Sequence, residues 1–360
     1  NFKRTKFFNK LILKFKNKNY SPYYFNYIFK YYLFKLYNIF NKINNNNKNK
    51  FIKNIKINNQ TFKLKYFNNY KIGDKLKQYY LIKNKIGINP FKMNNIILDE
   101  NLSRKEKPYD VAERIKSVIG AIYPTLGIQQ LNTIYNAVQE GVEEYGEKMN
   151  FDILREKLNE DESGYSNTAL SQLNSFFNQH PFKIDKDFSW DEIVQNDGRV
   201  SVIQLSGFSQ DIKLLIAEFL LWDLWYYKKQ NGSEQKPLSL VIDEAQNLDH
   251  SSKSPTAKIL TEGRKFGFSG IFSTQFLRGQ LSKDEISRLQ MASQKIYFMP
   301  PDNELKSIAS DFDNKNKWKK KLKKLVKGRC ISKGHILIEE EKELTESRSV
   351  IVDIASFEER

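Results

Sequence analysis

Two adjacent carboxylates, Asp243 and Glu244, follow a short apolar run within the stretch 238–248, which reads LSLVIDEAQNL. An uninterrupted apolar run of this kind is typical of a strand that a parallel sheet buries on both faces. Ligands of open α/β sheets bind at the carboxyl ends of the strands, where this pair would emerge. The pair therefore predicts nucleotide hydrolysis, in which Asp243 holds Mg²⁺, directly or through water, and Glu244 polarises the attacking water. The simpler alternative is an acidic N-cap on the helix that follows a core strand.

Two further features follow in chain order. The basic pair Arg264 and Lys265 precedes a glycine, and Gln275 stands at the end of the next apolar run. Neighbouring parallel strands are about 4.8 Å apart, so we expect Gln275 within a few ångströms of the acids. Phosphoryl transfer requires a metal holder, a group that orients water and a cation for the developing charge, and these residues can supply all three. As plainer alternatives, the basic pair is a solvated charge pair at a helix end, and Gln275 is an amide that caps a loop.

The segments around these residues alternate between strand and helix patterns. The acid-bearing strand, a helix from about residue 255 and a strand over 269–273 predict a right-handed βαβ unit. The flanking segments predict a strand over 199–205, a nearly all-apolar helix over 210–229, helices over 282–291, 302–310 and 318–327, and strands over 295–299 and 329–332. Alternating elements of this kind form a three-layer α/β domain with a mostly parallel sheet.

Residues 109–180 show helical patterns only. Apolar residues recur on one face of a helix that opens at Pro108 and ends before Pro124, and a second helix is predicted over about 128–145. Residues 151–180 predict two short helices joined by a loop. We interpret 109–180 as a helical insertion that contributes no chemistry.

The positive charge of the chain is concentrated at one end. Residues 1–90 hold 21 of the 59 Lys and Arg and one of the 42 Asp and Glu, a net charge of +20, so the other 270 residues hold 38 basic and 41 acidic residues, or −3. The first 90 residues also hold 19 Asn and 22 Phe and Tyr, but no Ala, Val, Glu, Met or Trp. Globular proteins are rich in Ala, Val and Glu, whereas this residue set is the one that A/T-rich triplets encode.

We therefore interpret most of residues 1–85 as A/T-rich DNA that is read out of frame or from outside a gene. Three alternatives remain open. Interleaved lysines and aromatic residues, as in 63–67, would suit a stacking surface for single-stranded nucleic acid. The aromatic stretch 20–40 would suit membrane insertion, although Lys30 and Lys35 interrupt it. An Asn- and Lys-rich disordered tail is the third alternative.

The cysteine and histidine content bounds the remaining chemistry. The single cysteine, Cys330, excludes an internal disulfide framework, and the three histidines are scattered rather than spaced like metal ligands. The sequence also shows no signal peptide with a small-residue cleavage site. We therefore expect a cytoplasmic protein without a membrane partner.

Several of these runs resemble a known family. The runs LVIDEAQNL, EGRKFGFSGIFSTQ and QKIYFMP are similar to the carboxyl-terminal half of the HerA/FtsK-type hexameric DNA-translocating ATPases, to which the type IV secretion ATPases are close relatives. Within this group the chain looks most like the DptH family, the HerA-like component of DNA phosphorothioation-dependent restriction, and the run INPF fits as well. The resemblance covers roughly residues 87–335.

The resemblance implies a RecA-like P-loop NTPase core that uses ATP and Mg²⁺. Asp243 would support Mg²⁺, Glu244 would be the general base and Gln275 would sense the γ-phosphate. Arg264 would be a finger placed across a ring interface, with Lys265 beside it at the nucleotide. The implied assembly is a homo-hexamer around double-stranded DNA, with the other Dpt restriction components as partners.

One feature of the family is missing. The chain contains no Gly-x-x-x-x-Gly-Lys-Ser/Thr sequence, the loop whose backbone amides and lysine hold the phosphates. We expect residues 1–86 to be low-complexity or out-of-frame, 87–340 to be a partial ATPase domain, and 341–360 to be a tail with a short strand. We also expect a truncated or frameshifted remnant with little or no ATPase activity by itself.

Two other functions remain possible on the sequence. The chain could be a non-catalytic ring subunit or scaffold that supplies Arg264 to a neighbour, or a basic single-stranded nucleic-acid-binding protein that acts through its amino-terminal region. A lysine cluster could add a DNA surface, although a solvated helix face is the plainer interpretation, and its members are Lys317, Lys319, Lys320, Lys321, Lys323, Lys324 and Lys327.

Overall fold

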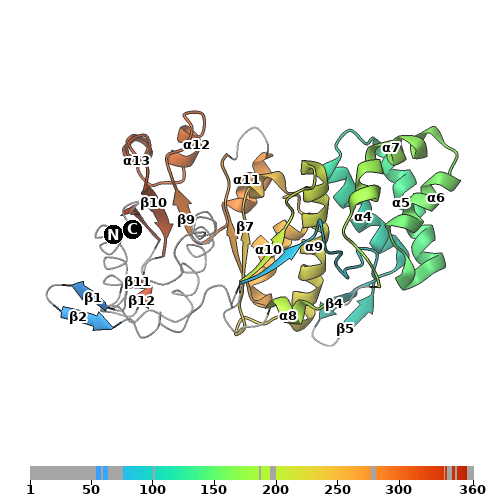
Figure 1. The fold of residues 1–360 in the computed structure, drawn as a ribbon. Helices are drawn as coiled ribbons and strands as arrows, with labels where there is room; N and C mark the ends of the chain where they lie inside the picture. The colour runs from blue at the N-terminus through green and yellow to red at the C-terminus, as the bar shows by residue number, and fades with distance from the viewer. Residues whose placement is uncertain are drawn as a thin grey trace, which may run out of the picture. The chain divides into compact units, whose positions relative to one another are not determined.

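The computed structural model describes residues 54–57, 60–63, 76–99, 102–185, 188–194, 200–276, 281–335, 337–338, 343–344 and 347–354. Most of residues 1–85, to which the four interpretations of the amino-terminal segment apply, lies outside these residues. Within that segment the structure describes the antiparallel pair β1 (Asn54–Ile57) and β2 (Gln60–Lys63), and residues 76–85. The chain divides into two compact units (Figure 1). The larger comprises Lys75–Gln275 and Gly279–Leu289, and the smaller comprises the remainder.

The larger unit begins earlier than the sequence indicates. Strand β3 (Leu76–Tyr80) pairs in parallel with β6 (Val200–Gln204) over all five residues. Leu81 and Ile86, which follow β3, are buried, at 3% and 5% exposure. Residues 76–86 therefore belong to the packed unit, and the expected boundary at residue 87 is too late. The Lys- and Tyr-rich composition of this segment conceals a strand whose tyrosine at position 79 packs against the core.

A second parallel pair carries the predicted acids. Strands β7 (Leu238–Ile242) and β8 (Phe268–Phe272) are paired residue for residue, and α10 (Pro255–Glu262) connects them. This is the predicted strand–helix–strand unit. Alternate residues of β7 (Leu238, Leu240 and Ile242) pack against a core to which the 22-residue helix α9 (Gln210–Asn231) contributes eight buried apolar side chains. The nearly all-apolar character of α9 follows from this burial.

The predicted helical insertion is confirmed. It consists of α4 (Pro108–Ile122), α5 (Ile128–Tyr145), the short turn η1 (Gly146–Lys148), α6 (Phe151–Glu160) and α7 (Gly164–Gln179). Local capping explains the boundaries: the Asn150 side chain accepts from two backbone N–H groups at the start of α6, and the Ser163 side chain accepts from Ser166 N–H at the start of α7. Phe151 lies at the centre of an aromatic cluster with Phe91, Phe176, Phe182 and Phe219.

A buried ion pair joins this insertion to the rest of the larger unit. The antiparallel hairpin of β4 (Asn95–Asp99) and β5 (Leu102–Lys105), which the sequence did not predict, leads into Glu106. Arg114 of α4 donates to both oxygens of Glu106, at 2.8 and 2.7 Å, and to the carbonyls of Pro90 and Lys92, at 3.1 and 2.9 Å. Tyr226 of α9 also donates to Glu106, at 2.7 Å. The INPF run is therefore held in place by the Arg114 guanidinium.

Removing one partner of this pair should be strongly destabilising. Glu106 and Arg114 are only 4% and 7% exposed, so Glu106→Ala would leave an uncompensated buried cation, at a cost of about 3–5 kcal/mol. Urea denaturation of the single and double variants measures this. In the Glu106→Ala background, Arg114→Met should restore part of the stability because it removes the unpaired charge. Losses that simply add would contradict this account of the pair.

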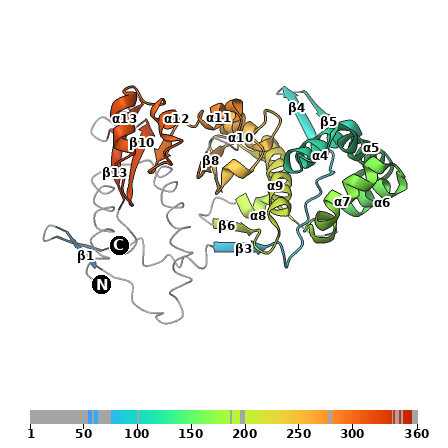
Figure 2. The same cartoon turned by 90° about the horizontal axis from the view of Figure 1, so that it is seen from above.

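The smaller unit contains an antiparallel sheet in the order β13-β10-β9, formed by β9 (Lys295–Tyr297), β10 (Arg329–Gly334) and β13 (Arg348–Asp353). Helices α12 (Leu305–Ala309) and α13 (Lys315–Leu322) lie beside it (Figures 1 and 2). The strands over 295–299 and 329–332 were predicted within one mostly parallel domain, and the short strand of the tail 341–360 outside it. They instead pair antiparallel with one another around a separate core, which includes Leu322 and Ile331.

The remaining described elements are short. They are α8 (Trp190–Val194), η2 (Ala245–Asn247), η3 (Gly263–Phe266), α11 (Lys283–Leu289), and the antiparallel pair β11 (Leu337–Ile338) and β12 (Glu343–Leu344). Among the residues that the structure describes, none of the helices combines the length and the apolar character needed to cross a bilayer.

Candidate functional site

The carboxyl ends of β7 and β8 bring three predicted residues together. The strands continue to pair just beyond their ends, because Ser273 N–H donates to Ile242 O at 2.9 Å and Ala245 N–H donates to Ser273 O at 2.8 Å. These two bonds place the residues after β7 beside those after β8. Asp243, Glu244 and Gln275 consequently lie at one edge of the sheet, as the parallel pairing predicts.

Hydrogen bonds orient both carboxylates. Gln275 Nε2 donates to Glu244 Oε1 at 2.6 Å, and Gln246 Nε2 donates to Glu244 Oε2 at 2.6 Å. The Ser273 hydroxyl donates to Asp243 Oδ1. The expected proximity of Gln275 to the acids is therefore confirmed. Gln246 and Ser273 were missed; their only sequence signal is that they lie within three residues of predicted site residues.

Glu244 has an unusual backbone conformation. Its φ and ψ of 56° and 39° lie in the left-handed region, and it is the one non-glycine residue with positive φ among the described residues. For an L-residue other than glycine this conformation costs about 1–2 kcal/mol. Strain of this kind collects at functional sites, where the surrounding structure holds it in place. Here the contacts of Glu244 with Gln246 and Gln275 provide that restraint.

The strain can be measured with two truncations that remove the same carboxylate. Glu244→Gly should be more stable than Glu244→Ala by about 0.5–1 kcal/mol, because the relief of backbone strain exceeds the entropy that glycine adds to the unfolded chain. Urea denaturation of both variants gives the difference directly. An alanine variant as stable as the glycine variant would show that the φ angle of 56° stores no strain.

The loop after Glu244 is anchored by buried polar side chains. His250 is fully buried, and its Nε2 lies 2.6 Å from Ala245 O, so this nitrogen carries the proton. Burial lowers the pKa of His250, which keeps the ring neutral. Arg288 of α11 donates to His250 O at 2.8 Å. From α9, Glu218 Oε1 accepts from Asp249 N–H at 2.8 Å. Helices α9 and α11 therefore hold the loop that carries Glu244.

Glu218 has a strongly shifted ionisation. Its side chain is 1% exposed, and burial raises its pKa from 4.5 to about 8, against the hydrogen bond donated by Asp249 N–H, which lowers it. The charge of Asp249 adds to the rise. The folded chain therefore holds a proton that the unfolded chain releases between about pH 4.5 and pH 8.

This shift predicts a loss of stability toward alkaline pH. Because the native state binds more protons than the unfolded state across this range, the free energy of unfolding falls as pH rises from about 4.5 to 8. Glu218→Gln retains an acceptor for Asp249 N–H but cannot ionise. The Tm of this variant minus the Tm of the wild type should therefore be more positive at pH 8 than at pH 5. An identical Tm difference at both pH values would refute the shift.

Arg264 and Lys265 lie at the opposite edge of the sheet from the acids. They belong to η3, which precedes β8, and Gly267 O accepts from Leu238 N–H at the start of β7, at 2.7 Å. A five-residue strand is about 16 Å long, so the two ends of β8 are well separated. The Arg264 side chain is 92% exposed, with Nε 3.6 Å from Glu234 Oε1, and Lys265 pairs with Glu262 at 3.2 Å. Within one chain the basic pair does not join the acid site.

The acid edge suits a magnesium–nucleotide complex better than a metal held by protein alone. Among the described residues there is no group of three or more His, Cys, Asp or Glu that could hold a metal. Mg²⁺ commonly binds through one or two carboxylates, waters and substrate phosphates, and the exposed Asp243 offers one such carboxylate. A phosphate-binding loop that would complete such a site is missing from the sequence.

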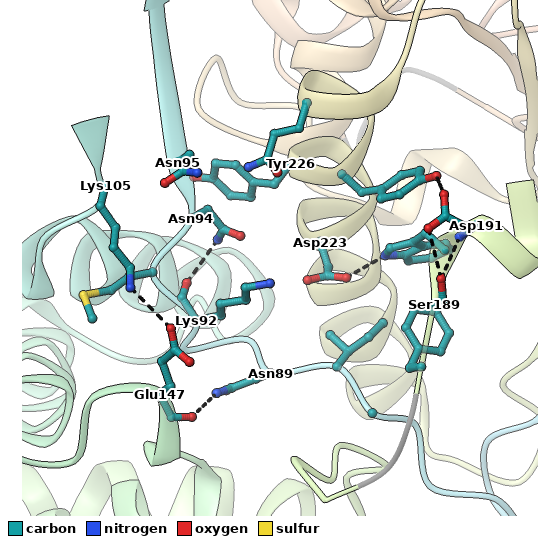
Figure 3. A pocket seen from close by; sticks show the side chains of 17 residues that line it. Asn89, Lys92, Asn94, Asn95, Lys105, Glu147, Ser189, Asp191, Asp223 and Tyr226 are labelled. Atoms are coloured by element: carbon teal, nitrogen blue, oxygen red, sulfur yellow. Dashed lines mark hydrogen bonds and ion pairs between the residues drawn. The ribbon is translucent and has the colours of Figure 1, made fainter. Parts of the chain in front are cut away.

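A cavity away from the acid edge lies elsewhere in the larger unit (Figure 3). It has a volume of about 510 Å³ and contains none of the predicted site residues. Lys92 and Asp223 face each other across it, and Trp190 Nε1 donates to Asp223 Oδ2 at 2.6 Å. Burial raises the pKa of Asp223. The pair Lys105 and Glu147, at 3.3 Å, closes one side.

Comparison with solved structures identifies the fold. The chain is similar to VirB4 of Thermoanaerobacter pseudethanolicus, with a TM-score of 0.54 and 13% identity over 78% of this chain and 76% of that one. It is also similar to the plasmid coupling protein TrwB in complex with the non-hydrolysable ATP analogue ADPNP, with a TM-score of 0.50 and 15% identity over 78% and 74%. No protein-family model and no curated protein matches the sequence. The chain has the RecA-like α/β fold of VirB4 and TrwB, which confirms the predicted fold class.

Proposed function

We propose that this chain is the carboxyl-terminal part of a HerA/FtsK-type DNA-translocating ATPase and carries the water-activating half of its site. The observation that carries the proposal is the 2.6 Å contact between Gln275 and Glu244 at the carboxyl ends of β7 and β8. TrwB, which has the same fold, has been solved with an ATP analogue, which supports ATP as the nucleotide.

Each residue at this edge has a distinct part in the proposal. Asp243 would hold Mg²⁺ through water, with the Ser273 hydroxyl fixing one of its oxygens. Glu244 would take a proton from the attacking water. Its two oxygens each accept one amide N–H, and a carboxylate offers about four acceptor sites, so lone pairs remain for that water. Gln275 would respond to the γ-phosphate, because a change in its position alters the orientation of Glu244.

The proposal requires groups from outside one 360-residue chain. Nucleotide binding needs a phosphate-binding loop, which this sequence lacks. The exposed Arg264, at the edge opposite the acids, would act on a nucleotide held by a neighbouring copy, with Lys265 beside it. An arrangement in which each copy uses opposite edges is head-to-tail, and such an interface forms a ring where its rotation closes and a filament where it does not. A homo-hexameric ring around double-stranded DNA is therefore part of the proposal.

At the finer level, we propose a role in DNA phosphorothioation-dependent restriction. The support is the sequence resemblance to the DptH family in the runs INPF, LVIDEAQNL, GRKFG and STQ. The protein would then act in the cytoplasm with the other Dpt restriction components. Mass spectrometry of proteins that co-purify with the tagged chain from its own host tests the restriction role alone. If no Dpt components co-purify, the restriction role is contradicted and the ATPase proposal is unaffected.

The decisive measurement is ATP binding and DNA-stimulated hydrolysis by the purified chain beside Glu244→Gln. We expect no hydrolysis above that of the variant, because the phosphate-binding loop is missing. Supplying the upstream segment from the adjacent DNA in the frame that encodes such a loop should restore hydrolysis, and Glu244→Gln should abolish it again. Hydrolysis by the chain alone that disappears in Glu244→Gln would instead reveal an unconventional phosphate site.

A second candidate is a non-catalytic ring subunit. The observation that favours it is the position of Arg264, whose 92% exposed side chain is available to a neighbour while the acids of the same chain lack a phosphate-binding loop. Light scattering distinguishes the two, since a scaffold would form the ring without nucleotide. A monomer at all concentrations, with or without ATP, would exclude it.

A further inference from the structure

The smaller unit carries a dense positive segment over 315–329. These 15 residues hold eight Lys and one Arg, and no acid. Outside the first 90 residues the chain has a net charge of −3, so this segment is an exception within the remainder. This segment begins with α13 and ends at the first residue of β10.

Three apolar side chains of this segment, Trp318, Leu322 and Leu325, pack against the core of the smaller unit, whereas Val326 and most of the lysines are exposed. Leu322 is fully buried, and the Trp318 ring stacks on Phe312 with 5.0 Å between centroids. Among the described residues, two of the nine cations have an ion-pair partner: Lys323 with Asp302 at 3.4 Å, and Arg329 with Asp353 at 2.5 Å. The exposed lysines without one are Lys315, Lys317, Lys319, Lys320, Lys324 and Lys327.

The cations converge on a small hollow of about 200 Å³. Four of its six lining residues are cationic, namely Lys320, Lys321, Lys324 and Arg329, and the other two, Leu325 and Ile351, are apolar. Two positions of α13, one residue just beyond that helix and the first residue of β10 thus present charge to one concave place. The ion pair with Asp353 orients the Arg329 guanidinium, and Lys321 Nζ lies 4.4 Å from the centre of the Trp318 ring. The chemistry that suits such a hollow is a phosphate group, because cations bind its oxygens through charge-assisted hydrogen bonds.

We propose that this hollow and the lysines around it bind the phosphodiester backbone of a nucleic-acid duplex. Helix α13 has eight residues and is about 12 Å long, the axial length of three to four phosphates of one strand. A membrane surface is a poorer match, since membrane-binding helices bury an apolar face in lipid and the apolar residues of α13 already face the protein core. The site rests on the charge and geometry of the smaller unit and is independent of the proposed ATPase activity.

The test is the binding of a 30-base-pair DNA duplex to the full chain. Fluorescence anisotropy measures the affinity at salt concentrations between about 50 and 200 mM. The slope of log affinity against log salt is negative. Replacing Lys320, Lys321 and Lys324 with Gln should reduce its magnitude by roughly 2 to 3, since each phosphate contact contributes about 0.9. Residues 1–75 are identical in the wild type and the triple variant, so the charge of these residues cancels in the comparison. The Glu244→Gln variant should bind like the wild type, which separates this site from the proposed ATPase.

The matched control is the triple replacement of Lys83, Lys148 and Lys283 with Gln. These lysines belong to the larger unit, are exposed and change the net charge equally. The control should change the slope by less than 1. Equal slopes for the two triple variants, or no change in the first, would overturn the proposal. The proposal would also be overturned if the variant of Lys320, Lys321 and Lys324 lost as much binding to vesicles containing phosphatidylserine as to DNA, because the site would then be a general anion surface. Circular dichroism of both variants verifies the fold.

Discussion

The parallel register of β7 and β8 is the constraint on which the candidate site depends. Ile242 lies opposite Phe272, and the two hydrogen bonds just beyond them bring Glu244 within 2.6 Å of Gln275. A slip of one residue would turn alternate side chains to the other face of the sheet and separate the acids from the amide. The burial of alternate β7 residues against the core that α9 shares excludes that slip, so the hydrophobic core sets the geometry of the polar edge.

The loop beyond β7 shows how polar burial supports this edge. A strained Glu244, a neutral buried His250 and a buried Glu218 are each unfavourable alone, yet their hydrogen bonds connect one loop to two helices. The ion pair of Glu106 and Arg114, to which Tyr226 of α9 also donates, has the same role for the segment that contains INPF. In both places buried polar groups hold irregular segments that apolar packing alone would leave without a unique conformation.

Local sequence patterns predicted the elements near the site and failed where long-range pairing decides. The predicted strands within 238–248 and over 269–273 and the predicted helix from about 255 correspond to β7, β8 and α10, and parallel pairing then placed Gln275 beside Glu244. Strand β3 was missed because its composition resembles the segment before it. The antiparallel pairing of β10 with β13 leaves no local signal. Chain order alone could have shown that Arg264, which precedes β8, lies at the edge away from the acids.

The left-handed conformation of Glu244 also gives the carboxylate at this position an energetic cost. Glutamate codons are a single base change from glycine codons, and glycine would adopt this φ without strain. A glutamate at this position therefore costs the fold about 1–2 kcal/mol of backbone strain that a glycine would not. The same conformation places its carboxylate within hydrogen-bond distance of both Gln246 and Gln275.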